Sequence, residues 1–149
     1  QIDTDHALLL PDDYVSSITE RMNLYRELDQ VKDQQGLEQF RQMLTDRFGP
    51  LPSQVEELLQ VVPLRWLAMK AGVEKIILKN NTLITYFVGN PESLFYRSEM
   101  FTRVIGNIQR NPRLFRMRQD GDRLSLRVNN VRSVSEAIRI IEQLQVSEQ

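Results

Sequence analysis

The chain has 149 residues, of which 41% are hydrophobic and 26% are charged, and this composition is typical of a globular domain. It contains no cysteine, which excludes disulfide bonds, thiolate catalysis and cysteine-bound zinc, and which favours a cytoplasmic location. No apolar stretch approaches the ~20 residues of a membrane span and no secretory leader is recognisable, so the sequence predicts neither membrane insertion nor secretion. Because the sequence begins at Gln1 rather than Met, we expect a piece excised from a longer protein.

The net charge of -1 conceals opposite charges in the two halves of the chain. Residues 1–60 carry 12 acidic and five basic side chains, whereas residues 61–149 carry eight acidic and 14 basic ones. This asymmetry indicates either an acidic docking face and a basic anion-binding face, or two halves that attract each other within one fold.

The first half of the chain predicts helices after an extended segment at residues 1–15. Ser17 and Glu20 have capping-box spacing and predict a first helix that ends near Gln30. Its buried face is expected to hold Ile18, Met22, Tyr25 and Leu28. A connector at residues 33–36 then precedes a second helix, whose apolar stripe is Leu37, Phe40, Leu44 and Phe48.

The second helix is predicted to end abruptly within the run "LTDRFGPLP". Gly49 can close a helix in the left-handed conformation, and Pro50 and Pro52 prevent its continuation. Arg47 complements the negative end of the helix dipole, whereas Asp46 opposes it by ~0.3–1 kcal/mol. Asp46 also lies off the apolar stripe, so we expect it to face outward at a position that helix stability does not explain.

A third helix is predicted from a second capping box, Ser53 with Glu56, to Gly72. Pro63 is expected to kink or split this helix. Trp66 is expected to pack at the edge of the core, and a role as an anchor for a partner is the alternative.

The second half of the chain predicts the element order ββαββα. The expected elements are a strand at 73–78, an Asn80–Asn81 turn, a strand at 82–88, a helical region opened by Asn90, a strand at 114–119, an Asp120–Gly121 turn, a strand at 122–128 and a helix capped by Ser133. The residues expected to be buried in the helical region are Leu94, Phe101, Val104, Ile105 and Ile108.

These elements predict an α+β fold, with an N-terminal helical subdomain followed by a ββαββα unit. Its sheet is expected to be four-stranded and mostly antiparallel, with helices on one face. Residues 1–149 are expected to form a single domain, with a helical part at 1–72 and a sheet-plus-helix part at 73–149.

The sequence offers no convergent set of catalytic groups. It has no glycine-rich phosphate loop, nucleophile elbow or two-histidine zinc helix, and its single histidine, His6, is expected to be solvated. Neighbouring carboxylates such as Asp12 and Asp13 point apart and make poor acid/base pairs. We therefore expect no enzyme activity, no cofactor, no metal site and no small-molecule substrate.

The second hairpin carries a basic sheet face. Apolar residues alternate with arginines, so period-2 geometry places four of them outward together, namely Arg116, Arg118, Arg123 and Arg127. Arginine binds phosphate through a bidentate fork, which makes a nucleic-acid-binding accessory domain one hypothesis. The lack of interleaved aromatic side chains and the isoelectric point of about 5.9 favour a solvated face balanced by the acidic half.

Three segments, in this order and spacing, resemble one family: "LLLPDDYV" at residues 8–15, "RMNLYREL" at 21–28 and "LTDRFGPLP" at 44–52. The family is the C-terminal domain of the bacterial transcription-repair coupling factors, the Mfd translocases. The resemblance extends from about Ile2 to the end of the chain. The Asp-Arg-Phe-Gly-x-Leu-Pro run is its most specific motif, and the region after Val73 matches by order and length.

The resemblance implies a non-catalytic, autoinhibitory regulatory domain of a DNA-translocating parent whose ATP-dependent motor lies in other domains. Such a domain docks on the UvrB-like module of the same parent chain and masks the surface that binds UvrA. Contacts with UvrA, RNA polymerase and DNA are implied only through the parent. Asp46 and Arg47 match the family motif at the docking face, and Met43 lies one turn earlier, where relatives can carry an acid.

Overall fold

The computed structural model describes residues 1–147 as two compact units that share one helix. Unit 2 comprises Ala7–Pro63, and unit 1 comprises Gln1–His6 together with the described residues from Leu64 onward. The boundary falls inside α3 (Ser53–Lys70), between Pro63 and Leu64. Each unit has its own buried apolar side chains and is described by itself.

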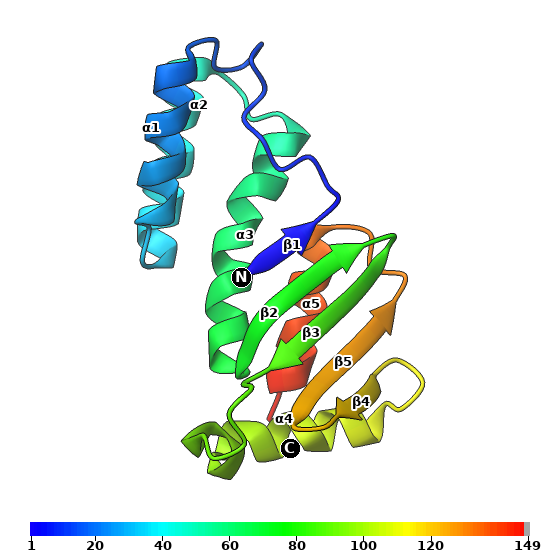
Figure 1. Cartoon of the computed structure of the whole chain (residues 1–149). Coiled ribbons are helices and arrows are strands. Elements are labelled where there is room, and N and C mark those ends of the chain that lie inside the picture. The colour runs from blue at the N-terminus through cyan, green and yellow to red at the C-terminus, as the bar shows by residue number, and fades with distance from the viewer. Residues whose placement is uncertain (148–149) are drawn as a thin grey trace. The chain divides into compact units, whose positions relative to one another are not determined.

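Unit 2 is helical, with α1 (Ile18–Asp29) and α2 (Gln34–Phe48) lying side by side as a hairpin that is followed by the first part of α3 (Figure 1). The predicted cap of α1 is confirmed, because the Ser17 hydroxyl accepts a hydrogen bond from the Glu20 N–H at 3.2 Å. The buried residues of this unit are Leu10, Val15, Leu24, Leu28, Leu37, Phe40, Leu44, Val55, Leu59, Val61 and Val62.

The predicted buried face of α1 is wrong in two positions. Ile18 is 70% exposed and Met22 is 50% exposed, whereas Leu24 and Leu28 are buried. Leu24 and Leu28 have the same four-residue spacing as Ile18 and Met22, and periodicity alone does not decide between two stripes of equal spacing. Tyr25 lies between the two faces, and its hydroxyl accepts a hydrogen bond from the Leu10 N–H at 2.7 Å.

Two predicted boundaries in unit 2 also differ from the structure. Asp33 caps α2 by accepting a hydrogen bond from the Gly36 N–H at 2.7 Å, so the predicted connector at 33–36 already contains the first helical turn. The Glu56 N–H donates to the Pro52 carbonyl at 3.1 Å, so α3 begins at Ser53 itself rather than after a Ser53 cap. The helix continues through Pro63 without being split.

Unit 1 contains a five-stranded sheet in the order β1-β2-β3-β5-β4. Its strands are β1 (Ile2–Thr4), β2 (Val73–Lys79), β3 (Thr82–Phe87), β4 (Arg116–Asp120) and β5 (Arg123–Asn129). All pairings are antiparallel except that of β1 with β2, which is parallel. The mostly antiparallel α+β fold is thus confirmed, but the expected four-stranded sheet has a fifth strand. Three residues are too short for a period-2 pattern to reveal it.

One face of this sheet is covered by helices: α4 (Glu99–Arg110), α5 (Val134–Gln145) and the last part of α3 (Figure 1). Ser133 caps α5 as predicted, accepting a hydrogen bond from the Glu136 N–H at 3.1 Å. No helix of the described residues is long and apolar enough to cross a membrane. The buried residues include Leu64, Ile76, Leu78, Leu83, Phe87, Val104, Ile108, Leu126, Val128, Ile141 and Leu144.

The helical region before β4 begins later than predicted. Ser98 caps α4, and a short 3-10 helix, η1 (Leu94–Arg97), precedes it. Leu94 is 78% exposed, so its predicted burial is wrong. The neighbouring ring of Phe95 packs instead on Phe101, with ring centroids 5.5 Å apart.

The first hairpin turn is confirmed at Asn80–Asn81, where both residues have positive φ, 53° and 55°. The second turn is shifted by one residue from its predicted place, because Asp120 pairs with Arg123 and leaves Gly121 and Asp122 as the loop. Moving a two-residue turn by one position changes the pairing by two residues. The predicted inward and outward faces therefore survive, since side chains alternate with period two.

Candidate functional site

The end of α2 is held by a side chain that precedes α1. The Tyr14 hydroxyl lies 2.8 Å from the Gly49 carbonyl oxygen and 3.2 Å from the Leu44 carbonyl oxygen, and donates to this pair. Its ring packs on Phe48 at 5.7 Å, and burial raises the pKa of the Tyr14 phenol. Gly49 has a φ of +92°, and its N–H donates to the Thr45 carbonyl at 3.0 Å.

Arg47 braces α2 against α1. Its guanidinium forms an ion pair with Glu20 and lies 4.9 Å from the centre of the Phe48 ring. It also donates to the Met43 sulfur at 3.7 Å, one helical turn earlier. The Arg47 guanidinium therefore interacts with three side chains of unit 2, and one of them, Met43, is half-buried.

Asp46 lies beside Arg47 in the sequence but faces solvent. Its carboxylate accepts a hydrogen bond from the Gln42 amide at 2.9 Å, and no cation of the described residues pairs with it. The C-terminal end of a helix dipole repels a carboxylate. Asp46 is thus an exposed, oriented anion that nothing in unit 2 neutralises.

Exposed apolar side chains form a second part of this surface, and we call them the apolar flank: Leu9, Ile18 and Met22. Leu9 is 59% exposed, and the neighbouring Leu10 is tied to Tyr25 on the same flank of α1. Ile18 and Met22 are four residues apart on α1, so they lie on the same side of the helix and one partner surface can cover both. Sequence reasoning missed this surface because it placed Ile18 and Met22 in the core.

Unit 2 as a whole is acidic, with ten acidic and five basic residues. Several of these charges are used internally, including Arg41, which pairs with Glu56 on α3 and lies 3.7 Å from Glu38. An acidic surface with an apolar flank suits a basic protein partner, because complementary charge orients the encounter and apolar burial supplies affinity.

The four arginines of the second hairpin lie together on one face of the sheet, as the alternation predicts. Arg116 is directly opposite Arg127, and Arg118 is opposite Ser125. No aromatic side chain interleaves with them within the hairpin, but the neighbouring strand β3 supplies one. The pairing of Tyr86 with Ser125 puts Tyr86 on the same face, with the Arg123 guanidinium 5.1 Å from the centre of its ring.

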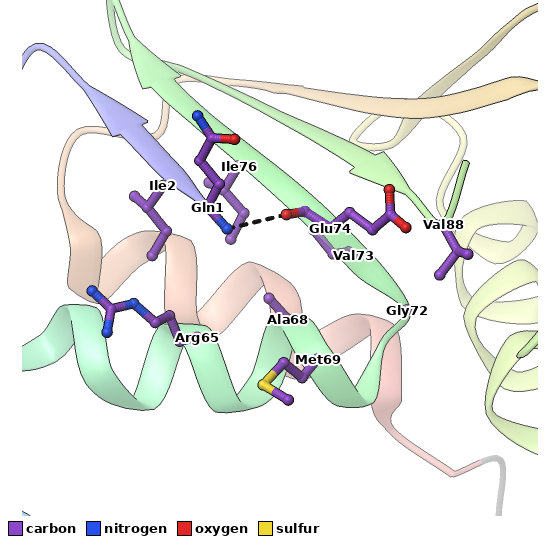
Figure 2. Close-up of a pocket in the computed structure, with 10 residues that line it drawn as sticks. All are labelled: Gln1, Ile2, Arg65, Ala68, Met69, Gly72, Val73, Glu74, Ile76 and Val88. Atoms are coloured by element: carbon purple, nitrogen blue, oxygen red, sulfur yellow. Dashed lines mark hydrogen bonds between the residues drawn. The ribbon is translucent and has the colours of Figure 1, made fainter. Parts of the chain in front are cut away.

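A cavity of about 390 Å³ lies in unit 1 between the last part of α3 and the edge of the sheet (Figure 2). Its walls are largely apolar, with side chains of Ile2, Ala68, Met69 and Val88 among them. The Gln1 amino group donates to the Glu74 carbonyl at 3.1 Å at its rim. Among the described residues no group of three or more acidic, histidine or cysteine side chains could hold a metal ion.

Comparison with known proteins identifies one family. The family model described as the TRCF domain matches residues 4–98. The transcription-repair-coupling factor of Rickettsia bellii (strain RML369-C) is 30% identical over 86 residues, which cover 58% of this chain and 8% of that protein. The corresponding factor of Escherichia coli (strain K12) is 37% identical over 68 residues, covering 46% of this chain and 6% of that protein.

Similarity of fold extends over nearly the whole chain. A crystal structure of the C-terminal domain of a transcription-repair coupling factor superposes with a TM-score of 0.75 at 18% sequence identity. The match covers 97% of this chain and 90% of that one. The chain therefore shares the fold of that domain, and its matched regions span less than a tenth of the two full-length relatives above.

Proposed function

Because this chain belongs to the TRCF domain family, we propose that it is the C-terminal regulatory domain of a transcription-repair coupling factor and acts by docking rather than by catalysis. Unit 2 docks on the UvrB-like module of the same parent chain and masks the surface that binds UvrA. The observation that carries this proposal is Asp46, an exposed carboxylate with no cationic partner among the described residues.

The position of Asp46 is unfavourable within the domain and favourable at an interface. A cation on the partner offsets the repulsion from the helix end, ~0.3–1 kcal/mol. An ion pair at the rim of an interface contributes only ~0–1 kcal/mol, so Asp46 sets register and association rate rather than holding the contact alone. Such a contact suits a clamp that must open.

The other two predicted docking residues support Asp46 rather than share its role. Arg47 is engaged with Glu20 and the Phe48 ring, so it positions the end of α2. The Met43 sulfur accepts a hydrogen bond from the Arg47 guanidinium, so Met43 helps to position Arg47. The apolar flank supplies the buried area of the interface, since Ile18 and Met22 are exposed side chains that a partner can cover.

Residues 1–149 form a single C-terminal domain of a longer parent chain, and this parent acts in the cytoplasm. The ATP-dependent motor lies elsewhere in the parent, and contacts with DNA, RNA polymerase and UvrA are made through it. A coupling of ~1–3 kcal/mol between docking and UvrA masking gives a reversible switch.

The test is calorimetric titration of this chain into the UvrB-like module of its own parent. Asp46→Arg is expected to weaken binding at least tenfold, about 1.4 kcal/mol, because it places like charges together at the interface. Glu27→Arg is the matched control, because Glu27 is also exposed in the last turn of a helix of unit 2. This substitution is expected to leave the affinity unchanged.

Two outcomes contradict the proposal. Equal affinities of the wild-type chain and Asp46→Arg remove Asp46 from the docking surface. In the full-length parent, Asp46→Arg is expected to expose the UvrA-binding surface, so that UvrA binds. If the variant parent binds UvrA no better than the wild-type parent does, autoinhibition at this surface is contradicted.

A further inference from the structure

The helices α4 and α5 cover one face of the sheet in unit 1 and leave the other face open (Figure 1). The strand registers place six cationic side chains on the open face, which we call the basic sheet face: Lys75, Lys79, Arg116, Arg118, Arg123 and Arg127. Three carboxylates approach three of these cations, with Asp3 3.1 Å from Lys79, Asp120 3.3 Å from Arg118 and Glu74 4.0 Å from Arg123. The cations are thus in twofold excess.

The excess is concentrated on β4 and β5. Arg116 and Arg127 are directly opposite each other, both are exposed, and no carboxylate of the described residues pairs with either. Like charges directly opposite each other destabilise an antiparallel pair. An anion placed between the two guanidinium groups removes this repulsion, and the planar fork of arginine matches phosphate.

An apolar and aromatic strip lies beside these arginines on β2 and β3. One row across the sheet is formed by Lys75, Tyr86, Ser125 and Arg118. The next row is formed by Ile77, Ile84, Arg127 and Arg116. Ile77, Ile84 and Tyr86 are partly exposed, so the face presents a ring and two aliphatic side chains next to a line of cations.

We propose that the basic sheet face binds single-stranded nucleic acid without sequence preference. Arg116, Arg118 and Arg127 contact the phosphates, and a base stacks on Tyr86, whose ring already carries the Arg123 guanidinium. A duplex keeps its bases stacked inside and leaves the apolar strip unused. An acidic protein segment offers charge but no flat ring for Tyr86. All of these residues belong to unit 1, so this proposal does not depend on docking by unit 2.

The test is fluorescence anisotropy of a labelled oligo-dT of about 20 nucleotides, titrated with the whole chain at about 20 mM salt. Micromolar to submillimolar binding is expected, roughly 10⁻⁶–10⁻⁴ M, with a salt slope of about -0.7 per phosphate contact. R116E/R127E is expected to weaken binding at least tenfold and to make the slope shallower by about 1.4.

The control for net charge is K70E/R139E, which makes the same change at exposed positions on α3 and α5 and is expected to retain most of the affinity. Tyr86→Ala is expected to weaken binding roughly fivefold or more, while Tyr86→Phe retains it, because the phenyl ring is sufficient for stacking. Unchanged circular dichroism and melting temperature show that each variant is folded.

Three results overturn the proposal. The first is the absence of binding at low salt. The second is an equal loss of affinity in the two double variants, which assigns binding to net charge. The third is binding of poly-glutamate as tight as that of oligo-dT and insensitive to Tyr86→Ala, which assigns the face to an acidic protein partner.

Discussion

Adjacent residues at the end of α2 have opposite environments, because successive positions on a helix are rotated by about 100°. Arg47 turns toward α1 and pairs with Glu20, whereas Asp46 turns to solvent and its carboxylate accepts a hydrogen bond from Gln42. The sequence motif marks both residues equally. Only the structure separates Arg47, which positions the helix end, from Asp46, which a partner can reach.

The Tyr14 hydroxyl is predicted to stabilise unit 2 through the end of α2. Tyr14→Phe retains the ring contact with Phe48 but loses the donor to the Gly49 and Leu44 carbonyls, so the free energy of unfolding is expected to fall by about 1 kcal/mol. Urea unfolding measures this loss. Tyr86→Phe is the control, since no hydrogen bond of the Tyr86 hydroxyl is found among the described residues, and it is expected to change stability little.

The same residue predicts a dependence of stability on pH. Burial raises the pKa of Tyr14 in the folded state, so its stabilising contribution is fully present below about pH 10 and is lost as the pH rises through the folded-state value. Above pH 10 the wild type is therefore expected to lose stability more steeply than Tyr14→Phe. Burial also raises the pKa of Tyr96, but Tyr96 lies in unit 1, so its loss of stability at high pH belongs to the unfolding of that unit. Parallel losses in the two proteins would exclude Tyr14 as the source.

The β4–β5 hairpin shows how an element can be predicted correctly while its turn is not. The pair Asp120–Gly121 is a strong turn signal, yet Gly121 occupies the first position of the loop with a φ of +60°. A positive φ at the first central residue, with glycine there, is the arrangement of a type II′ turn. The shift leaves the arginine face intact but sets Arg116 opposite Arg127.

Gly121→Ala is expected to destabilise unit 1 by about 1 kcal/mol or somewhat more, because a left-handed φ is costly for a residue with a Cβ atom. No atom lies within 4 Å of that added Cβ, so the cost is conformational and not steric. Gly106→Ala, inside α4, should change stability in the opposite direction, by up to about 1 kcal/mol, because its Cβ meets only the flexible end of the Arg110 side chain, 3.2 Å away, which can shift. Thermal unfolding of both variants checks the two signs, and a stabilised Gly121→Ala would contradict the assigned turn.

At the scale of the whole molecule, the chain divides within one continuous helix. Pro63 has no N–H to donate to the Leu59 carbonyl, and the boundary between the units falls directly after it. A missing hydrogen bond at the boundary weakens the cooperativity that α3 would otherwise transmit. The two units are therefore expected to unfold in separate steps.

Trp66, the only tryptophan of the chain, lies in the part of α3 that belongs to unit 1, so its fluorescence is used to follow that unit. Urea transitions followed by its fluorescence and by far-ultraviolet circular dichroism are expected not to coincide. Pro63→Ala completes the hydrogen-bond ladder of α3 and is expected to bring the two midpoints closer. Coincident transitions in the wild type would show that the units unfold together.

The sequence by itself determined the features that depend on short-range geometry. These features are set by residues that are close together in the sequence: the helix caps at Ser17 and Ser133, the Asn80–Asn81 turn and the alternation of arginines on β4 and β5. Each follows from allowed φ and ψ values or from the helical and strand periods. The family resemblance likewise rests on local motifs, and the matched TRCF domain family confirms it.

Only the tertiary structure decided the contacts between distant residues. It paired β1 with β2, buried Leu24 rather than Ile18, placed Tyr14 on the carbonyls of α2 and brought Tyr86 beside Arg123. These choices depend on the free energy of packing a whole unit, in which several local patterns of similar quality compete. The residues of the apolar flank and of the basic sheet face are exposed because packing buries other residues in the core, and local sequence patterns do not decide which residues are buried.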